Sequence, residues 1–118
     1  MKYALLLYAD ESLQPDYTTT EGAAEMQEWF TFSQELAAAG AMLGGEALRD
    51  TPTATTVQVR DGSTITADGP FAETKEALGG SYLIDVDDLD AAIAWAEKIP
   101  NVGYGTVEIR PVMTFDED

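Results

Sequence analysis

The alternation of apolar and polar residues predicts a chain built mainly of strands. The run at 2–9 is apolar at successive positions, which is typical of a strand that is covered on both faces and lies inside a sheet. A second strand is expected over 41–48, weakened or bulged at Gly44-Gly45. An apolar strand is expected over 81–86 and the last strand over 106–112.

Two segments have apolar residues at helical spacing. The first begins where Thr18 and Glu21 have the spacing of a capping box, and it ends at Gly40, where a left-handed cap is expected. Its predicted apolar face consists of Met26, Trp29, Phe30, Ser33, Leu36 and Ala37. The second begins at Asp87-Asp88 and ends at Pro100, and its predicted buried stripe consists of Leu89, Ala92, Ile93, Ala96 and Ile99.

Glycine-containing turns divide the middle of the chain. Asp61-Gly62 separates two strand-like segments, 55–60 and 63–68, and is a strong signal for a two-residue hairpin. Gly69-Pro70 then forces a turn, because glycine tolerates unusual backbone angles and proline fixes its own. Gly79-Gly80 lacks the following Lys of a phosphate-binding loop and is interpreted as a place of close backbone approach.

The order of these elements predicts an α+β fold. It matches a ferredoxin-like βαββαβ plan with an added β-hairpin, in which both helices cover one face of an antiparallel sheet. No further helix is available for the other face, so two copies are expected to pair their sheets across a two-fold axis. Residues 1–112 are expected to form a single domain, followed by an acidic tail at 113–118.

Charge narrows the classes of partner. The chain has 22 acidic and 6 basic side chains, a formal net charge of −16, and such a surface repels nucleic-acid phosphates and anionic lipid heads. Direct contact with nucleic acid or membrane is therefore not expected. No segment approaches the roughly 20 apolar residues of a membrane span. Asp10-Glu11 follows the opening apolar run where a signal peptide would need a cleavage site, so a cytoplasmic protein is expected.

The sequence contains neither Cys nor His. This excludes disulfides, thiol catalysis, thiolate metal sites, and His-based general base catalysis or haem ligation. Binding of Mg²⁺ or Ca²⁺ through oxygen ligands stays open, although nothing in the chain has the pattern of a calcium loop. A protein that works without a metal or a cofactor is the expectation.

Several motifs resemble the DGPF-type branch of the YCII-related proteins. The longest is Asp68-Gly-Pro-Phe-Ala-Glu-Thr-Lys-Glu76, followed by Leu78-Gly-Gly80 and by Tyr82-Leu-Ile-Asp-Val-Asp-Asp-Leu-Asp90. The resemblance extends to nearly the whole chain, because the opening Met1-Lys-Tyr and the segment Val107-Glu-Ile-Arg-Pro-Val112 also fit. It implies a ferredoxin-like fold of which two copies form a dimeric α/β barrel.

The resemblance also implies two kinds of role. Many members of the family accompany extracytoplasmic-function sigma factors, although the acidity of this chain argues against DNA contact. Other members have been proposed as enzymes that use a His–Asp pair. This chain has no His, so that mechanism cannot be carried over to it.

Ionisable residues around the Gly69-Pro70 turn are the candidate catalytic groups. A partly buried carboxylate beside an ammonium can act as a base or as a substrate clamp. A tyrosine on a neighbouring strand can supply a weak proton donor. The predicted catalytic residues are Asp68, Glu73, Lys75 and Tyr82, and the predicted substrate contacts are Tyr8, Asp10 and Phe71.

Structural explanations exist for the same residues. Asp68 can accept hydrogen bonds from turn amides, Thr74 can cap a helical turn, and Lys75 can pair with a nearby acid. For Asp68 the structural role is favoured, whereas for Glu73 and Lys75 neither reading is. Tyrosines at strand positions are more often core residues, yet two central strands can bring Tyr82 and Asp10 to one cleft.

Two functions from different classes follow. The first is a cofactor-free small-molecule enzyme of the isomerase, lyase or dehalogenase type. The second is a non-catalytic homodimeric binding or regulatory module, associated with sigma-factor-linked transcription regulation. The missing His favours the second, and the dense polar segment 68–76 beside an apolar strand favours the first.

Overall fold

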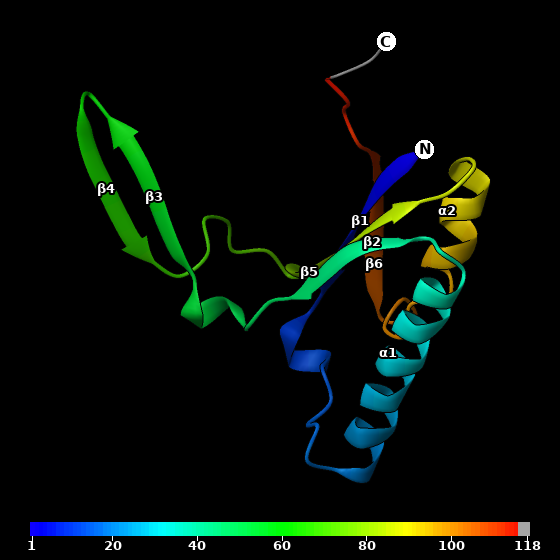
Figure 1. The fold of residues 1–118 in the computed structure, drawn as a ribbon. Helices are drawn as coiled ribbons and strands as arrows, with labels where there is room; N and C mark the ends of the chain where they lie inside the picture. The colour runs from blue at the N-terminus through cyan, green and yellow to red at the C-terminus, as the bar shows by residue number, and fades with distance from the viewer. Residues whose placement is uncertain (116–118) are drawn as a thin grey trace.

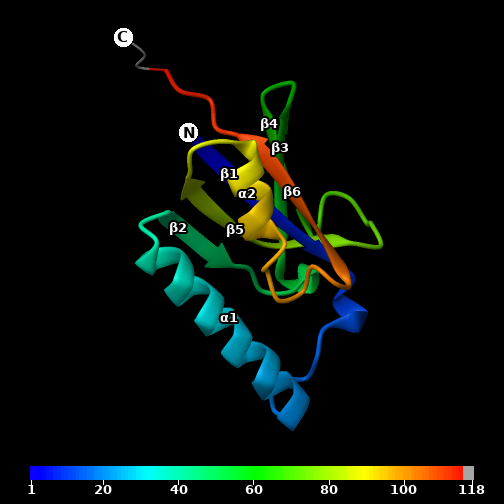
Figure 2. The same cartoon turned by 90° about the vertical axis from the view of Figure 1, so that its right-hand side faces the viewer.

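Four strands form one antiparallel sheet in the computed structural model, which describes residues 1–115. Along the sheet the order is β2 (Met42–Ala47), β5 (Ala77–Asp85), β1 (Lys2–Ala9) and β6 (Gly105–Pro111). The helices α1 (Thr20–Ala38) and α2 (Leu89–Ala96) cover one face of it (Figures 1 and 2). This is the ferredoxin-like arrangement, so the predicted α+β class is confirmed.

A separate hairpin is inserted between β2 and β5. Its strands are β3 (Thr55–Arg60) and β4 (Ser63–Asp68), and they pair only with each other. Two single-turn helices, η1 (Glu11–Leu13) and η2 (Thr51–Thr53), lie in the connections after β1 and β2. Asp61 and Gly62 have φ angles of 53° and 78°, as a two-residue hairpin turn requires, and Gly69 has a φ of 94°.

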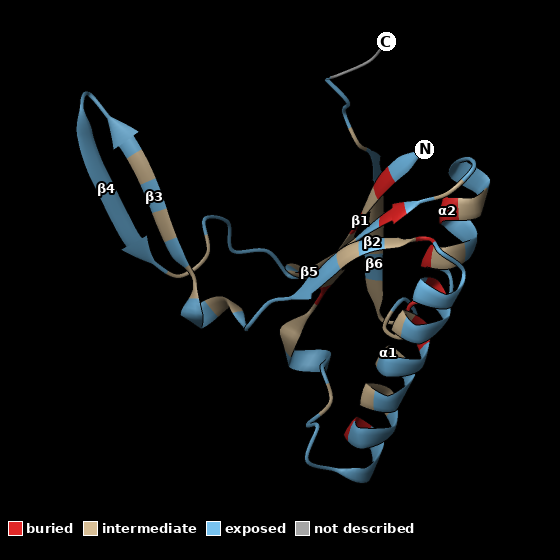
Figure 3. Ribbon diagram, in the orientation of Figure 1, coloured by how far each residue is buried: buried red, intermediate tan, exposed pale blue. Residues whose placement is uncertain are grey.

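The hydrophobic core lies between the sheet and the helices. On β1 every second side chain is buried, and these side chains face the helices (Figure 3). The other strands and the helices supply the rest of the core: Phe32, Leu36, Ala41, Ile84, Ala92 and Ile99 join Tyr3, Leu5 and Leu7. Within residues 1–115 no helix lies on the opposite face of the sheet, so the apolar run of β1 reflects its central position between β5 and β6.

The helices differ in detail from the predicted ones. Thr19, not Thr18, caps α1, because its hydroxyl oxygen accepts a hydrogen bond from the Gly22 N–H at 3.1 Å. Phe32 enters the core, whereas Phe30 is exposed. On α2, Leu89 and Ile93 are exposed, and only the Ala92, Ala96 and Ile99 part of the predicted stripe is buried. No helix among the described residues is long and apolar enough to cross a membrane.

The strand β5 begins four residues earlier than the apolar pattern predicts. Its first part, Ala77–Gly80, is poor in large apolar residues but pairs with β1, and Ala47 of β2 pairs with Gly80. A Cβ on Gly80 would lie 2.9 Å from the Glu46 carbonyl oxygen, which confirms close backbone approach there, while Gly79 faces open space. The expected irregularity in β2 is a register shift between Met42 and Gly44.

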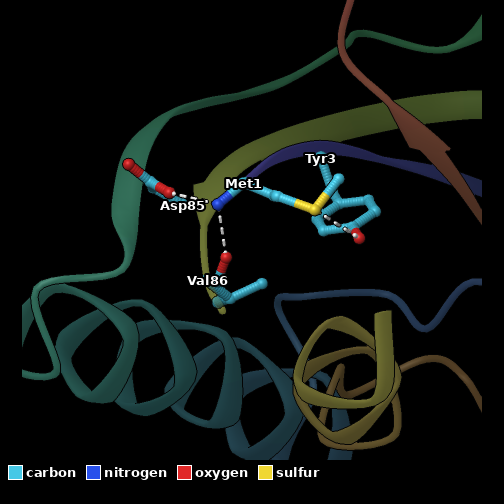
Figure 4. Close-up of polar contacts among 4 residues, drawn as sticks. All are labelled: Met1, Tyr3, Asp85 and Val86. Carbon is cyan, nitrogen blue, oxygen red and sulfur yellow. Dashed lines mark hydrogen bonds and ion pairs between the residues drawn. The ribbon is translucent and has the colours of Figure 1, made fainter. Parts of the chain in front are cut away.

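Met1 connects the start of β1 to the end of β5 through polar contacts. The Met1 ammonium donates to the Val86 carbonyl at 2.6 Å and pairs with the Asp85 carboxylate at 3.1 Å (Figure 4). The Tyr3 hydroxyl contacts the Met1 sulfur at 3.8 Å. Both members of the ion pair are exposed, so its contribution to stability is small, about 0–1 kcal/mol.

Candidate functional site

A cavity of about 360 Å³ lies between α1 and the helix-covered face of the sheet. It exists because small residues line the sheet there: Ala47, Gly80 and Leu7 are paired across β2, β5 and β1, and two of the three have little or no side chain. The core residues Phe32 and Leu36 fill the space further along α1. The volume lies in the range typical of small-molecule pockets, about 300–1,000 Å³.

The wall of the cavity is mostly apolar and aromatic. The apolar part comes from α1, the sheet and the segment after β2, and it consists of Leu7, Ala9, Met26, Trp29, Phe30, Met42, Ala47 and Leu48. Tyrosines and a few polar groups complete it: Gln14, Tyr17, Ser33, Glu46, Ser81, Tyr82, Asn101 and Tyr104. A largely apolar wall with a few convergent polar groups is typical of a ligand pocket.

One pair of hydroxyl groups belongs to the cavity wall. Ser33 of α1 and Tyr82 of β5 share a hydrogen bond of 2.9 Å, in which either oxygen can be the donor. The Tyr82 ring packs edge-on against Phe32, with the ring centroids 5.2 Å apart. Gly45 leaves room for this ring, because a Cβ there would lie 2.9 Å from Tyr82 Cδ1. Packing on both sides therefore fixes the position of this hydroxyl pair.

A single carboxylate holds three aromatic residues of the wall. Glu25 of α1 accepts a hydrogen bond from the Tyr104 hydroxyl at 2.7 Å, from the Tyr17 hydroxyl at 3.1 Å and from the Trp29 indole N–H at 3.2 Å. Tyr17 precedes α1, Trp29 lies on α1, and Tyr104 precedes β6. Glu25 therefore connects three separate parts of the chain and acts as a positioning residue for the wall.

Both tyrosines bound to Glu25 stay protonated at neutral pH. Partial burial, followed by the hydrogen bond to Glu25 and its negative charge, raises the pKa of Tyr104 well above its ordinary value. Burial and the Glu25 charge also raise the pKa of Tyr17. Their protons are directed to Glu25, whereas the Ser33 and Tyr82 hydroxyl groups of the wall are left for a ligand.

The predicted catalytic residues do not share this cavity. Tyr82 lines it, whereas Asp68, Glu73 and Lys75 are exposed and are not part of its wall. Phe71 is 82 % exposed and does not line it either. Gly69 donates its N–H to the Ala54 carbonyl oxygen at 2.7 Å.

Tyr8 and Asp10 occupy different surroundings from Tyr82. Tyr8 alternates with the buried residues of β1 and lies on the open face of the sheet. There it adds to the lowering of the pKa of Glu108, of which the hydrogen bond from Arg110 is the main cause. Tyr8 and Tyr82 are thus on opposite faces of the sheet, and Asp10 does not line the cavity.

Asp10 and Lys75 are the two predicted site residues that influence each other. Hydrogen bonds from the Ser12 hydroxyl at 2.7 Å and the Ser12 N–H at 2.9 Å lower the pKa of Asp10. The positive charge of Lys75 lowers it further, by less. A carboxylate with a lowered pKa is a weaker base, so this arrangement makes Asp10 less suited to proton abstraction.

Sequence reasoning did not predict that the Glu25 cluster and Ser33 belong to the cavity. The one local signal was the spacing of Glu25 and Trp29, four residues apart on a helix, which brings their side chains together. Tyr17 and Tyr104 lie in loops, and Glu25 and Tyr104 are 79 positions apart in the sequence, with no pattern that predicts the contact. Within residues 1–115, no group of three or more acidic side chains is placed to hold a metal ion.

The fold and the cavity define a small α+β domain with a cavity between one helix and the sheet. The model of the YCII-related domain matches residues 1–116. An uncharacterized protein of Rhizobium meliloti (strain 1021) is 37 % identical over 117 residues, which cover 98 % of this chain and 94 % of that protein. The chain belongs to the YCII-related domain family.

Proposed function

We propose that this protein binds a small, mostly apolar molecule in the cavity between α1 and the sheet. The observation that carries the proposal is a 360 Å³ space whose wall is apolar except for a fixed hydroxyl pair and a few polar side chains. A ligand that fills such a space is removed from water, which contributes roughly 25 cal/mol per Å² of apolar surface. The same wall gives the ligand orientation through the hydroxyl groups.

The Ser33–Tyr82 pair sets the polar contact. Two hydroxyl groups that share one hydrogen bond retain one further O–H and several lone pairs between them. A ligand oxygen or nitrogen can therefore accept one hydrogen bond from the pair. The aromatic residues held by Glu25 suit a flat apolar portion of the ligand, because ring faces stack well on one another.

The charges around the cavity select against anions. No Lys or Arg lines the wall, while Glu46 does, and Glu25 lies directly behind the aromatic residues. The chain as a whole carries a formal charge of −16, which repels anionic molecules during encounter. The ligand class is therefore neutral or positively charged, and a cation can also be held over the aromatic faces.

A non-catalytic binding or regulatory module is the form of this function that the cavity supports best. Three of the four candidate catalytic residues lie outside the wall and are exposed. A link to sigma-factor-dependent transcription stays a prediction from the family resemblance. The same holds for the DGPF-type branch, which rests on residues 68–71, and for a cytoplasmic location.

A cofactor-free enzyme is the second candidate, favoured by Tyr82. Its hydroxyl lies in the cavity with a fixed partner, Ser33, and can donate a proton to a bound substrate. Asp68, Glu73 and Lys75 belong to this candidate as predicted catalytic groups. A screen of neutral substrates tests it. Loss of turnover in Tyr82→Phe with unchanged substrate binding supports catalysis. Unchanged turnover in Tyr82→Phe, Asp68→Asn, Glu73→Gln and Lys75→Ala rejects all these roles.

We also propose that two copies of the chain pair through the open faces of their sheets. In the described part of the chain no helix covers the open face of the sheet, and this face carries exposed apolar side chains such as Leu83 and Leu78 of β5. Two such faces placed together exclude water from both and form the predicted dimeric barrel. The cavity lies on the other face, so one chain forms it alone.

Three probes with one ring system test the ligand class. 2-Naphthalenemethanol is neutral, 2-naphthylmethylamine is positively charged and 2-naphthoate is negatively charged at neutral pH. Calorimetric titration is expected to show binding of the first two and binding of naphthoate weaker by about tenfold or more, about 1.4 kcal/mol. Binding of none of the three, or equal binding of naphthoate, contradicts the proposal.

A matched pair of substitutions locates the binding. Ala47→Phe places a ring in the cavity and is expected to weaken the neutral probe by about tenfold or more. Ala94→Phe adds the same ring on the exposed side of α2, away from the cavity wall, and is expected to leave binding unchanged. Equal binding by parent and Ala47→Phe protein places the probe elsewhere and rejects the cavity.

A further inference from the structure

Three aromatic side chains of the cavity wall share one carboxylate whose charge no basic side chain balances. Tyr17, Trp29 and Tyr104 line the cavity, and each donates its polar hydrogen to Glu25. Within residues 1–115 no ion pair includes Glu25. A glutamate carboxylate is ionised at neutral pH, and it accepts hydrogen bonds without donating any. A negative charge without a counter-ion therefore lies directly behind three rings of the wall.

The surroundings of these rings add negative and not positive charge. Among the residues of the described chain that line the cavity there is no Lys or Arg. Burial and Glu25 raise the pKa of Tyr104, and the charge of Glu28, on the same helix as Glu25, adds to this effect. Tyr104 and Tyr17 thus stay protonated and remain donors to Glu25 at neutral pH. A cation that enters the cavity therefore meets a favourable electrostatic potential, whereas an anion does not.

Hydrogen bonding to Glu25 also changes the rings themselves. A carboxylate that accepts the hydrogen of an indole N–H or a phenol O–H polarises the donor and leaves more electron density on its ring. The face of such a ring is negative and attracts a cation within about 6 Å of the ring centre, and Trp does so most strongly. Trp29 and Tyr104 are polarised in this way, across hydrogen bonds of 3.2 Å and 2.7 Å. The rings thus carry the effect of Glu25 into the cavity, although Glu25 is not part of the wall.

We propose that the cavity is selective for an organic cation, an ammonium group on an apolar body, with the ammonium held against Tyr17, Trp29 and Tyr104. Glu25 is a positioning residue that fixes these three rings and strengthens their attraction for the cation. This inference rests on the proposed function and narrows its ligand class from neutral or cationic molecules to cationic ones. The apolar body of the ligand occupies the rest of the cavity, where its burial adds to the affinity.

Two probes of nearly equal shape that differ in charge test the selectivity. 2-Naphthylmethylamine carries an ammonium group at neutral pH, and 2-naphthalenemethanol carries a hydroxyl group at the same position. Calorimetric titration of the parent protein is expected to show that the amine binds about tenfold more tightly than the alcohol. If the alcohol binds as tightly as the amine, the selectivity is overturned while the proposed function stands. If neither probe binds, the proposed function fails and the selectivity fails with it.

Removal of the Glu25 charge separates its effect from the acidity of the whole chain. Glu25→Gln keeps the shape of the side chain and is expected to reduce the preference for the amine to about threefold or less, with little change for the alcohol. Glu21→Gln removes the same charge from the exposed first turn of α1 and is expected to keep the preference. A purely structural role of Glu25 changes the affinity of both probes equally. An unchanged preference in Glu25→Gln, or an equal loss of preference in both variants, therefore overturns the proposal.

A second pair of variants tests the rings and leaves Glu25 in place. Trp29→Leu removes a ring that is bound to Glu25, and it is expected to lower the ratio of amine to alcohol affinity by about threefold or more. Phe30→Leu removes the neighbouring ring of the wall, which makes no hydrogen bond to Glu25, and it is expected to leave this ratio unchanged. A ratio that stays the same in Trp29→Leu, or that falls as far in Phe30→Leu, contradicts recognition of the cation by the rings bound to Glu25.

Discussion

The hairpin of β3 and β4 and the rest of the molecule, which we call the body, both have regularly paired strands, but they differ in what covers those strands. In the body, β1 is hydrogen-bonded on both sides and buries every second side chain under the helices. In the hairpin, β3 and β4 are as regularly paired, yet their apolar side chains face water. A short turn is therefore enough to pair two strands that are neighbours in the sequence. Burial of their apolar side chains requires a second surface, such as the helices that cover β1.

The largest test of this comparison is one substitution made in both parts. Ile84 on β5 is fully buried, whereas Ile65 on β4 is 48 % exposed. Ile84→Ala is expected to lower the free energy of unfolding by about 2–5 kcal/mol, because it leaves a cavity in the core. Ile65→Ala is expected to change it by less than about 0.5 kcal/mol, as is usual at the surface.

Denaturant unfolding at low protein concentration measures both values, since association then contributes least. Ile65→Ala with a loss as large as that of Ile84→Ala would show that the hairpin is packed within a single chain. That outcome contradicts the division between body and hairpin.

Two adjacent glycines of β5 provide a finer test inside the body. A Cβ on Gly80 would lie 2.9 Å from the Glu46 carbonyl oxygen, so Gly80→Ala is expected to cost about 1–3 kcal/mol by forcing β2 and β5 apart. Gly79 has open space around the same position, and Gly79→Ala is expected to be neutral, within about 0.5 kcal/mol. Thermal unfolding of both variants distinguishes them. Equal losses would mean that strand flexibility, and not close approach, explains the glycine pair.

The sequence predicted those parts of the fold that local signals determine. Gly40 ends α1 with a φ of 72°, Asp61-Gly62 forms the hairpin turn, and Asp88 caps α2 by accepting from the Ala91 N–H at 2.9 Å. The order of elements was sufficient for the ferredoxin-like class. These features depend on a few neighbouring residues each, so their patterns can be read along the chain.

The remaining features depend on contacts between distant segments. The early start of β5 results from its pairing with β1 and β2. The glycine-rich residues at this end of β5 carry no strand pattern that predicts this pairing. Of the predicted site residues, Tyr82 alone lines the cavity, because strand alternation decides its face only once the register is known. Glu25 was missed, since two of its three donors come from loops.

The polar network behind the cavity wall can be examined through its pH dependence. Glu25→Gln removes the negative charge but keeps the shape, and it is expected to lower the pKa of Tyr104 toward the ordinary value of 10.0, although burial still holds it above. In the parent protein the Tyr104 hydroxyl keeps its proton to higher pH in the folded chain than in the unfolded chain. Stability is therefore complete below about pH 10 and falls as the pH rises above it. The fall is expected to be smaller in Glu25→Gln.

Tyrosinate absorbance during an alkaline titration measures the pKa, and unfolding between pH 9 and 11 measures the stability, a range of about one unit on each side of the ordinary tyrosine value. Glu21→Gln, on the exposed first turn of α1, removes the same charge at a distance and serves as the control. Identical titration of parent and Glu25→Gln protein contradicts the assigned role of Glu25.

The smallest expected change in the free energy of unfolding comes from removing either of two exposed cations, Lys98 in the body and Arg60 on the hairpin. Lys98 lies 3.4 Å from the Glu35 carboxylate and 5.0 Å from the centre of the Trp95 ring, so it joins the end of α2 to α1. Because the pair is exposed, Lys98→Ala is expected to cost only about 0.5–1 kcal/mol, and less in high salt. Arg60→Ala at the hairpin turn is expected to cost almost nothing in dilute protein, since its guanidinium donates only to the neighbouring Val59 carbonyl oxygen at 3.0 Å. If Arg60→Ala lowers the free energy of unfolding more than Lys98→Ala does under those conditions, Arg60 makes a stabilising contact within a single chain. The hairpin would then differ from the body only in how its apolar side chains are packed.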